Sequence, residues 1–341
     1  MRVLVPARAS ILALVVATCG ATPATAPAAV PDPLPSPAPV PAWITDLGGR
    51  IVFGRESGDP TTFTVLRMAA DGTGLTPVGA PTTASRSLVT WGPHGRLLFE
   101  SDRDGTMQVF DMDDGGGEVR QLTMGPELHG NPAISPDGST MAFGTWTETR
   151  DLGIHLAAAD GSDTQPRTLT TPPDRTMSGD AQPAFSPDGR LLAFQRVLDA
   201  SEEKAVKAAI FVIGLDGTGL RQLTPASMDA GHPRWSPDGR TILFHDNADM
   251  QEPTLGQSAN LWTMAADGSD LRQLTHEAGG NYAIEGTWAP DGSAIAFASW
   301  SGEDEFTAIR VMHADGTDAT PVWTGTFAGG SGNDPEWSAG S

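Results

Sequence analysis

Cysteine, lysine and long apolar runs are nearly absent from this sequence, and each absence excludes a class of protein or site. The single cysteine, Cys19, excludes an intramolecular disulfide and a cysteine-based metal site. There are 21 basic residues, of which two are lysines, against 42 acidic residues. The resulting net charge of −21 opposes binding to nucleic acid or to an anionic lipid surface. The apolar run at residues 11–18 is too short to cross a membrane as a mature helix.

The N-terminus carries a secretion pattern followed by a spacer. Arg2 and Arg8 precede the apolar run, which is the order found in a secretory signal peptide. The segment VATC that ends the run resembles a bacterial lipoprotein signal, in which the cysteine becomes the lipidated first residue of the mature chain. The alternative is a secretory signal cleaved after residues 26–28. We predict a signal peptide over residues 1–19, lipidated at Cys19, and a proline- and alanine-rich linker over residues 20–43.

Glycine and proline are abundant, with 40 and 28 residues, and favour turns and short strands over long helices. One phrase, built on Pro-Asp-Gly between two apolar segments, recurs along the chain. Its copies and near copies read WGPHGRLLF, ISPDGSTMAF, FSPDGRLLAF, WSPDGRTILF and WAPDGSAIAF, beginning at Trp91, Ile134, Phe185, Trp235 and Trp288. A spacing of 43 to 53 residues between starts is typical of a repeat architecture.

A second phrase, exemplified by DGTGLRQLT, occurs in six copies, against five complete copies of the first. The missing first phrase is divided between the chain ends: DPEWSAGS at residues 334–341 supplies its beginning, and GGRIVFGRE at residues 48–56 supplies its end. Closing a ring in this way removes exposed strand edges. We therefore predict an all-β fold, a six-bladed β-propeller over residues 44–341. It has four-stranded blades, and its ring is closed by N-terminal strands pairing with the C-terminal strand.

The two phrases resemble the WD-repeat-like propeller repeats of the TolB protein family, and related repeats occur in the propellers of dipeptidyl-peptidase-type enzymes. The resemblance covers residues 44–341. TolB proteins also carry an α/β domain before the propeller, whereas a signal and a spacer precede it in this sequence. The resemblance implies a propeller that binds protein or peptide partners at the cell envelope.

The aspartate of the repeated phrase, such as Asp238, is interpreted as a turn residue. Proline fixes φ, aspartate accepts hydrogen bonds from nearby backbone N–H groups, and glycine adopts positive φ. In the second blade His94 replaces the aspartate, a change that a turn tolerates and a required catalytic acid would not.

The sequence lacks three common catalytic and ligand-binding motifs. It contains no Gly-x-Ser-x-Gly elbow, no His-Glu-x-x-His zinc helix and no Gly-x-x-x-x-Gly-Lys phosphate loop. The acidic segment at residues 111–115 lacks the spacing of an EF-hand loop. A metal cluster could form from His232, His245, Asp246 and Glu285, but lone histidines on a polar rim are more often solvated. The sequence therefore predicts no catalytic residue, no metal and no cofactor.

The candidate binding residues lie at the mouth of the central channel. Successive strands alternate in direction, so the Asp-Gly turns share one face of the disk and the variable connections share the other. One position precedes the first strand of a blade and holds Asn131, Gln182, His232, Glu285 and Asp334. A second position follows the second strand and holds Arg55, Arg103, Trp146, Arg196, His245 and Trp300. These residues predict a site for a peptide segment or a small polar ligand, with a hydrated, ligand-free rim as the alternative.

The functional prediction is an extracytoplasmic, non-enzymatic binding scaffold, lipid-anchored through Cys19 or secreted. Its expected partner is an envelope protein or peptide, or a small polar ligand or glycan at the channel mouth. Nucleic acid is excluded, and contact with the membrane is expected only through the lipid. One alternative is a propeller enzyme, a polysaccharide lyase or hydrolase, that uses the channel-mouth residues, because scattered catalytic residues leave no short motif. Another is a repeat protein whose partner is a second domain in another chain.

Overall fold

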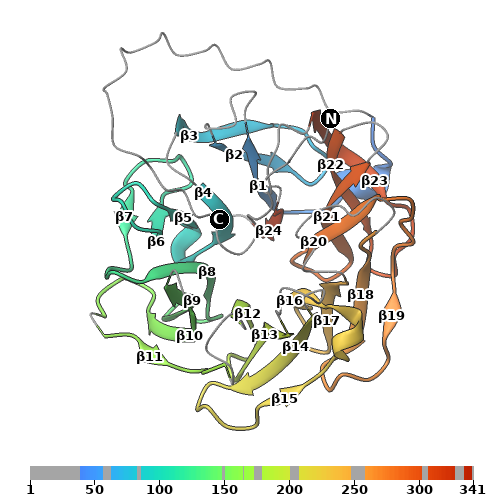
Figure 1. Cartoon of the computed structure of the whole chain (residues 1–341). Coiled ribbons are helices and arrows are strands. Elements are labelled where there is room, and N and C mark those ends of the chain that lie inside the picture. Colours follow the sequence, from blue (N-terminus) through green and yellow to red (C-terminus); the bar gives the residue numbers. More distant parts are fainter. Residues whose placement is uncertain are drawn as a thin grey trace, which may run out of the picture.

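The computed structural model describes residues 39–56, 63–82, 86–147, 150–163, 165–172, 179–199, 207–246, 258–301, 306–326 and 334–339. The predicted signal peptide, Cys19 and residues 20–38 of the predicted linker lie outside these ranges. The described residues form six four-stranded antiparallel sheets, arranged as the blades of a ring (Figure 1). Within these ranges no helix is both long enough and apolar enough to cross a membrane.

The blades are numbered along the chain, and their strands are given from the centre of the ring outwards. Blade 1 holds β24 (Glu336–Ser338), β1 (Arg50–Glu56), β2 (Phe63–Ala69) and β3 (Thr76–Thr82). Blade 2 holds β4 (Arg86–Trp91), β5 (Leu97–Ser101), β6 (Gln108–Met112) and β7 (Arg120–Gln121). Blade 3 holds β8 (Leu128–Ile134), β9 (Thr140–Thr147), β10 (Arg150–Ala158) and β11 (Arg167–Thr168).

The second half of the ring follows the same order. Blade 4 holds β12 (Asp180–Phe185), β13 (Leu191–Asp199), β14 (Lys207–Gly214) and β15 (Arg221–Gln222). Blade 5 holds β16 (Gly231–Trp235), β17 (Thr241–His245), β18 (Leu261–Ala265) and β19 (Arg272–Gln273). Blade 6 holds β20 (Tyr282–Trp288), β21 (Ala294–Ser301), β22 (Phe306–His313) and β23 (Thr320–Thr326). The helices are short: α1 (Ala42–Thr45) and the 3-10 turns Pro93–Gly95 and Ala226–Met228.

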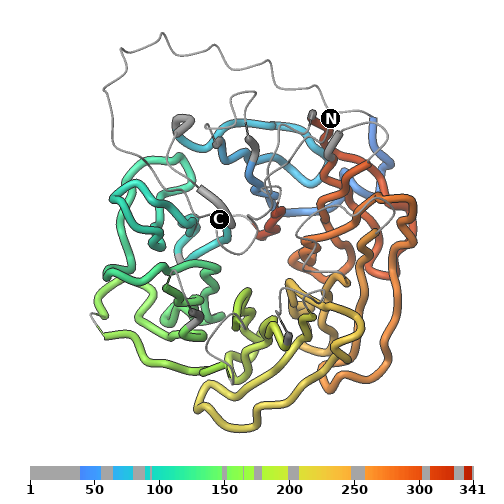
Figure 2. The backbone as a smooth tube through the Cα atoms, viewed as in Figure 1, coloured from blue at the N-terminus to red at the C-terminus, as the bar shows by residue number. Residues whose placement is uncertain are grey.

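The ring closes in blade 1, as predicted from the divided repeat. The C-terminal strand β24 pairs antiparallel with β1, and Trp337 lies opposite Ile51. The Trp337 indole also donates to the Gly48 carbonyl at 3.0 Å. Figure 2 shows the blue and red ends of the described chain meeting in this blade. The predicted six-bladed, all-β architecture with N- and C-terminal closure is therefore confirmed.

The hydrophobic core lies between neighbouring blades, which cover both faces of each second strand. Every second strand buries one phenylalanine at the same place in the repeat. These residues are Phe53, Phe99, Phe143, Phe194, Phe244 and Phe297. In one of the resulting clusters, Phe99 of blade 2 packs with Val52 and Val65 of blade 1. The repeated apolar segment therefore packs the blades against one another as well as forming a strand.

Tryptophans at the ends of two inner strands tie blade 5 to blade 4 and blade 6 to blade 5. The indole N–H of Trp235 donates to the Ala184 carbonyl at 3.2 Å, and that of Trp288 donates to the Arg234 carbonyl at 3.2 Å. Both bonds connect a blade to the preceding inner strand. The large ring fills the gap between blades, and its one polar atom finds a backbone acceptor. These two tryptophans therefore lie between successive blades and connect them.

Asp238 is a turn residue, as the repeated phrase predicts. Its carboxylate accepts hydrogen bonds from the Ser236 hydroxyl at 2.6 Å and from the Arg240 N–H at 3.1 Å. The first of these bonds is the largest cause of the lowered pKa of Asp238. Gly239 supplies the positive φ of 70°. The side chain therefore serves the local backbone.

The outermost strand is shorter than predicted in blade 5. The sequence predicts a strand over residues 271–275, but only Arg272 and Gln273 pair with β18. The Arg272 side chain instead reaches the Asp315 carbonyl of blade 6 at 2.8 Å. A short edge strand that contacts the next blade limits the unpaired backbone exposed at the rim.

Candidate functional site

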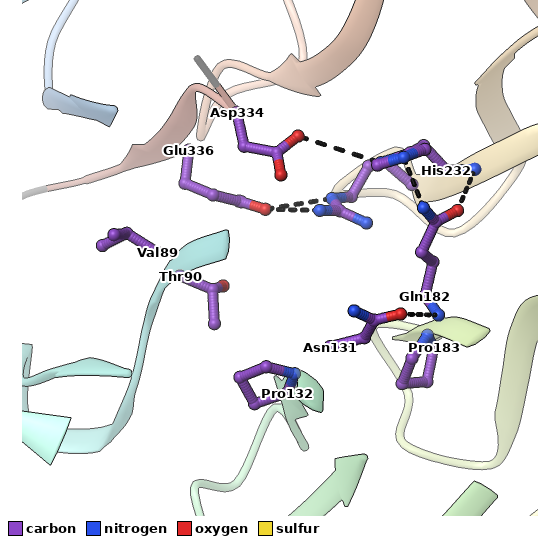
Figure 3. A pocket seen from close by; sticks show the side chains of 10 residues that line it. Val89, Thr90, Asn131, Pro132, Gln182, Pro183, His232, Asp334 and Glu336 are labelled. Atoms are coloured by element: carbon purple, nitrogen blue, oxygen red, sulfur yellow. Dashed lines mark hydrogen bonds and ion pairs between the residues drawn. The ribbon is translucent and has the colours of Figure 1, made fainter. Parts of the chain in front are cut away.

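A pocket opens at the centre of the ring, between the inner strands (Figure 3). It contains about 330 Å³ of empty space, part of it open to solvent. Its lining residues are Val89, Thr90, Asn131, Pro132, Gln182, Pro183, His232, Arg234, Asp334 and Glu336. They come from β4, β8, β12, β16 and the segment that leads into and begins β24. Five of the six blades therefore contribute to one small space.

Four of the predicted channel-mouth residues share an unusual backbone conformation. Asn131, Gln182, His232 and Glu285 have φ angles of 51°, 54°, 52° and 56°. Residues other than glycine seldom adopt this left-handed region. At each of these positions the register between the first and second strands shifts, as in a β-bulge. Strain of this kind, on the order of 1–3 kcal/mol per residue, persists only where surrounding contacts enforce it.

The enforcing contacts are hydrogen bonds that pass from blade to blade. Asn131 Nδ2 donates to Glu100 Oε1 at 3.0 Å, and the Asn131 backbone N–H donates to the same oxygen. The Gln182 N–H donates to Asn131 Oδ1 at 3.1 Å. The His232 N–H donates to Gln182 Oε1 at 2.9 Å. Along blades 2 to 5, the side chain of one blade thus holds the backbone of the next.

A cluster of two histidines and two carboxyl groups continues this network through blades 5, 6 and 1. Donor atoms of His232, Glu285 and Asp334 all lie within 4.8 Å of one another, and His232 Nδ1 is 3.8 Å from Asp334 Oδ1. The carboxyl groups of Glu285 and Asp334 are hydrogen-bonded to each other. The His245 ring stacks on His232 with 4.7 Å between ring centroids, and His245 Nδ1 accepts the Glu285 N–H at 3.2 Å.

Burial controls the protonation of this cluster. It raises the pKa of Glu285 well above its ordinary value, and the charge of Asp334 raises it further. Burial also raises the pKa of Asp334 to about 6, although the Arg234 charge acts in the opposite direction. Burial lowers the pKa of His245 to about 3 and that of His232 well below its ordinary value. Near neutral pH the two acids therefore share a proton, and both imidazoles are neutral.

Arg234 and Glu336 form an ion pair across the pocket, at positions that are not among the predicted channel-mouth residues. Arg234 Nη2 and Nε lie 2.7 and 3.1 Å from Glu336 Oε1. Each residue occupies the variable position of a Pro-x-Trp triplet, two residues after His232 or Asp334. Alternation along the inner strand was the available signal, because residues two apart share one face of a strand.

Two of the predicted arginines support their own blades and lie outside the pocket lining. Arg196 makes a buried, bidentate ion pair with Asp180, with both N–O distances 2.6 Å. The Arg103 guanidinium lies over the Phe110 ring at 4.9 Å from its centroid. Arg55 lies in β1, and its side chain is outside the described part of the molecule.

The predicted tryptophans also lie outside the pocket lining. Trp300 stacks on Tyr282 with 5.1 Å between ring centroids, and Trp146 lies against Gly130. Asp246, which the sequence places near a possible metal cluster, accepts instead from the Asn260 N–H at 2.6 Å and the Trp262 indole at 2.9 Å. Asp334 lies beside His232 and Glu285, in the place predicted for Asp246, because the pairing of β24 with β1 closes the ring and brings Asp334 to the channel mouth.

The TolB beta propeller domain family matches residues 39–203 and 175–338, in two overlapping segments that cover the whole ring. The chain belongs to this family. An uncharacterized protein of Agrobacterium fabrum is 23% identical over 254 residues, which are 73% of this chain and 79% of that protein. Other curated relatives, which include peptidases and TolB homologues, are matched over about a third or less of their own length.

Solved structures share the TolB-type propeller fold. TolB from Acinetobacter baumannii has a TM-score of 0.66 and 18% identity, covering 87% of this chain and 68% of that one. An oligogalacturonate lyase in complex with manganese has a TM-score of 0.52 and 16% identity, covering 82% of this chain and 74% of that one. At these identities the likeness establishes the fold alone.

Proposed function

We propose that this TolB-type propeller, residues 44–341, is a non-enzymatic binding scaffold of the cell envelope whose channel mouth receives a segment of a protein or peptide partner. The observation that carries the proposal is the central pocket, to which five blades contribute polar side chains. Part of its empty space is open to solvent, so a group of a partner can reach these side chains from the channel. Curated TolB homologues among the relatives support an envelope partner.

A site-specific photocrosslinker tests partner binding. Thr90 lines the pocket, whereas Thr218 is exposed on an Asp-Gly turn. With the probe at position 90, we expect a discrete adduct with an envelope protein in living cells, and with the probe at position 218 we expect none. No adduct at position 90, or the same adducts at both positions, would contradict the proposal.

The location of the scaffold is proposed from the N-terminus: outside the cytoplasm, anchored by a lipid on Cys19. The charged start, the apolar run and the segment VATC motivate it. Cells fed a labelled fatty acid should label the wild-type chain, and Cys19→Ser should abolish the label. An unlabelled wild-type chain would refute the anchor and favour a secreted form cleaved after residues 26–28.

A polysaccharide lyase is the second candidate, favoured by the imidazole and carboxyl groups that face the pocket and by the likeness to oligogalacturonate lyase. Elimination from an oligogalacturonate creates an unsaturated uronate, which absorbs ultraviolet light. If the chain is a lyase, this absorbance should grow with time, and His232→Ala should abolish the growth without unfolding the ring. A wild-type protein that produces no absorbance would exclude this substrate.

A further inference from the structure

The three donors of the channel cluster come from three different blades. His232 lies in β16 of blade 5, Glu285 lies in β20 of blade 6, and Asp334 directly precedes β24 of blade 1. One imidazole and two carboxylates form a donor set that suits Zn²⁺, which binds histidine nitrogen and carboxylate oxygen. An ion that prefers oxygen alone, such as Ca²⁺, would gain little from the imidazole.

The spacing of the donors fits one ion after small side-chain adjustments. Bonds of about 2.1 Å to a tetrahedral ion place ligand atoms roughly 3.4 Å apart. His232 Nδ1 and Asp334 Oδ1 are already 3.8 Å apart, and no pair in the triad exceeds 4.8 Å. The bulged backbone at His232 and Glu285 holds two of the donors on adjacent inner strands. An ion between the two carboxyl groups would replace their shared proton, which leaves to solvent, and would supply the positive charge that two ionised carboxylates at this distance need.

We propose that His232, Glu285 and Asp334 bind one Zn²⁺ ion, with the remaining coordination position facing the pocket. Three protein ligands and one open position are typical of zinc sites that act on a ligand or substrate. The positive charge of Arg234 acts on the cluster, but its ion pair with Glu336 places a carboxylate beside it that offsets part of this charge. This inference is independent of the proposed partner, since the ion needs only residues of this chain.

Gln182 is the positioning residue for the histidine. Its amide nitrogen contacts His232 Nε2, and its Oε1 accepts the His232 backbone N–H at 2.9 Å. In this arrangement Nε2 accepts, so the ring proton sits on Nδ1, the atom that faces Asp334. Binding an ion through Nδ1 moves the proton to Nε2, which then needs an acceptor. A carboxylate at position 182 would accept from both the backbone N–H and Nε2–H.

Titration calorimetry with ZnCl₂ on the chelator-treated mature chain tests the site directly. We expect one ion per chain, and affinity about 100-fold weaker or lost in His232→Ala, Glu285→Gln and Asp334→Asn. Asp137→Asn, which removes a carboxylate from a turn on the opposite face, is the matched control and should bind as the wild type does. No binding by the wild type, or unchanged binding by Asp334→Asn, would overturn the proposal.

Two further measurements separate this site from adventitious binding and from misfolding. Co²⁺ in place of Zn²⁺ should give a visible ligand-field spectrum that is lost in His232→Ala, while the melting temperature in chelator shows whether each variant is folded. CaCl₂ should bind more weakly than ZnCl₂. Equal affinity for both ions, together with unchanged binding in His232→Ala, would overturn the role of the imidazole.

The two Gln182 variants test the positioning role because they are expected to change Zn²⁺ affinity in opposite directions. Gln182→Glu should tighten Zn²⁺ binding by about 10-fold, because the carboxylate accepts Nε2–H and fixes the tautomer that coordinates through Nδ1. Gln182→Ala should weaken it, since no acceptor remains. A merely structural role predicts weaker binding in both variants, so a loss of affinity in Gln182→Glu would refute this part of the proposal.

Discussion

The two faces of the disk use the same repeat in opposite ways. On the turn face, Asp137, Asp188 and Asp238 each accept a serine hydroxyl and a backbone N–H from within their own turn. At the channel mouth, Asn131, Gln182 and His232 share one backbone conformation, but their side chains differ and bond to neighbouring blades. Identical local contacts build the blades, and different inter-blade contacts build the pocket.

Arg234→Met is expected to have the largest effect on the free energy of unfolding, and it tests the contrast between the two faces. The substitution leaves the Glu336 carboxylate, whose side chain is 14% exposed, without its partner and close to Asp334. We expect a loss of about 3 kcal/mol in the free energy of unfolding, measured by urea denaturation. Arg234→Met combined with Glu336→Gln should recover most of it, because no unpaired charge remains. If Arg234→Met lowers the free energy of unfolding by less than Gly239→Ala does on the turn face, the contrast between the two faces is wrong.

The second prediction concerns the pH dependence of stability, to which the buried groups at the channel mouth contribute. The folded chain retains the Glu285 proton at pH values where the unfolded chain has lost it, so this group contributes stability at low pH that is lost as the pH rises through the raised pKa. His232 and His245 act in the opposite sense, but only below about pH 6.5, where the unfolded histidines protonate.

In chelator, therefore, the melting temperature should fall as the pH rises from 6.5 to 8.5, and it should fall less in Glu285→Gln. Differential scanning calorimetry at several pH values measures both slopes. Asp188→Asn on the turn face serves as the control and should keep the wild-type slope, because the pKa of Asp188 is lowered. Equal slopes in Glu285→Gln and the wild type would contradict the protonated state of the pair.

The smallest effect is expected from Gly239→Ala on the turn face. The added Cβ would meet only Pro187, with Cδ at 3.5 Å and Cγ at 3.8 Å, which are ordinary contacts, so the cost comes from the positive φ of 70°. We expect about 1 kcal/mol less stability, measured in the same urea series, and unchanged Zn²⁺ affinity. A change in affinity would show that the two faces are coupled.

Much of the fold could be predicted from the sequence because the same sequence pattern recurs from blade to blade. The turn chemistry at Asp238 acts within one turn, the buried phenylalanine recurs in each second strand, and the divided repeat marks the two chain ends that pair in blade 1. Four residues of the first candidate position, Asn131, Gln182, His232 and Asp334, line the pocket, since their place in the repeat fixes their place in the ring. No residue of the second position is among the pocket-lining residues, although His245 stacks on His232. Arg196 found a partner in Asp180, and Trp300 one in Tyr282, within their own blades.

The sequence by itself determined the number of blades, their strands and the way the ring closes, because repeated local patterns specify repeated local structure. Only the tertiary structure decided that His232, Glu285 and Asp334 meet, and that Arg234 pairs with Glu336 across the pocket. Residues 232 and 334 occupy the same position of their repeats, which places both at the channel mouth, but the repeat does not specify which of the residues at that position come into contact. Closing the ring with β24 brings them together, and burial at the centre of the ring then gives these groups their unusual proton affinities.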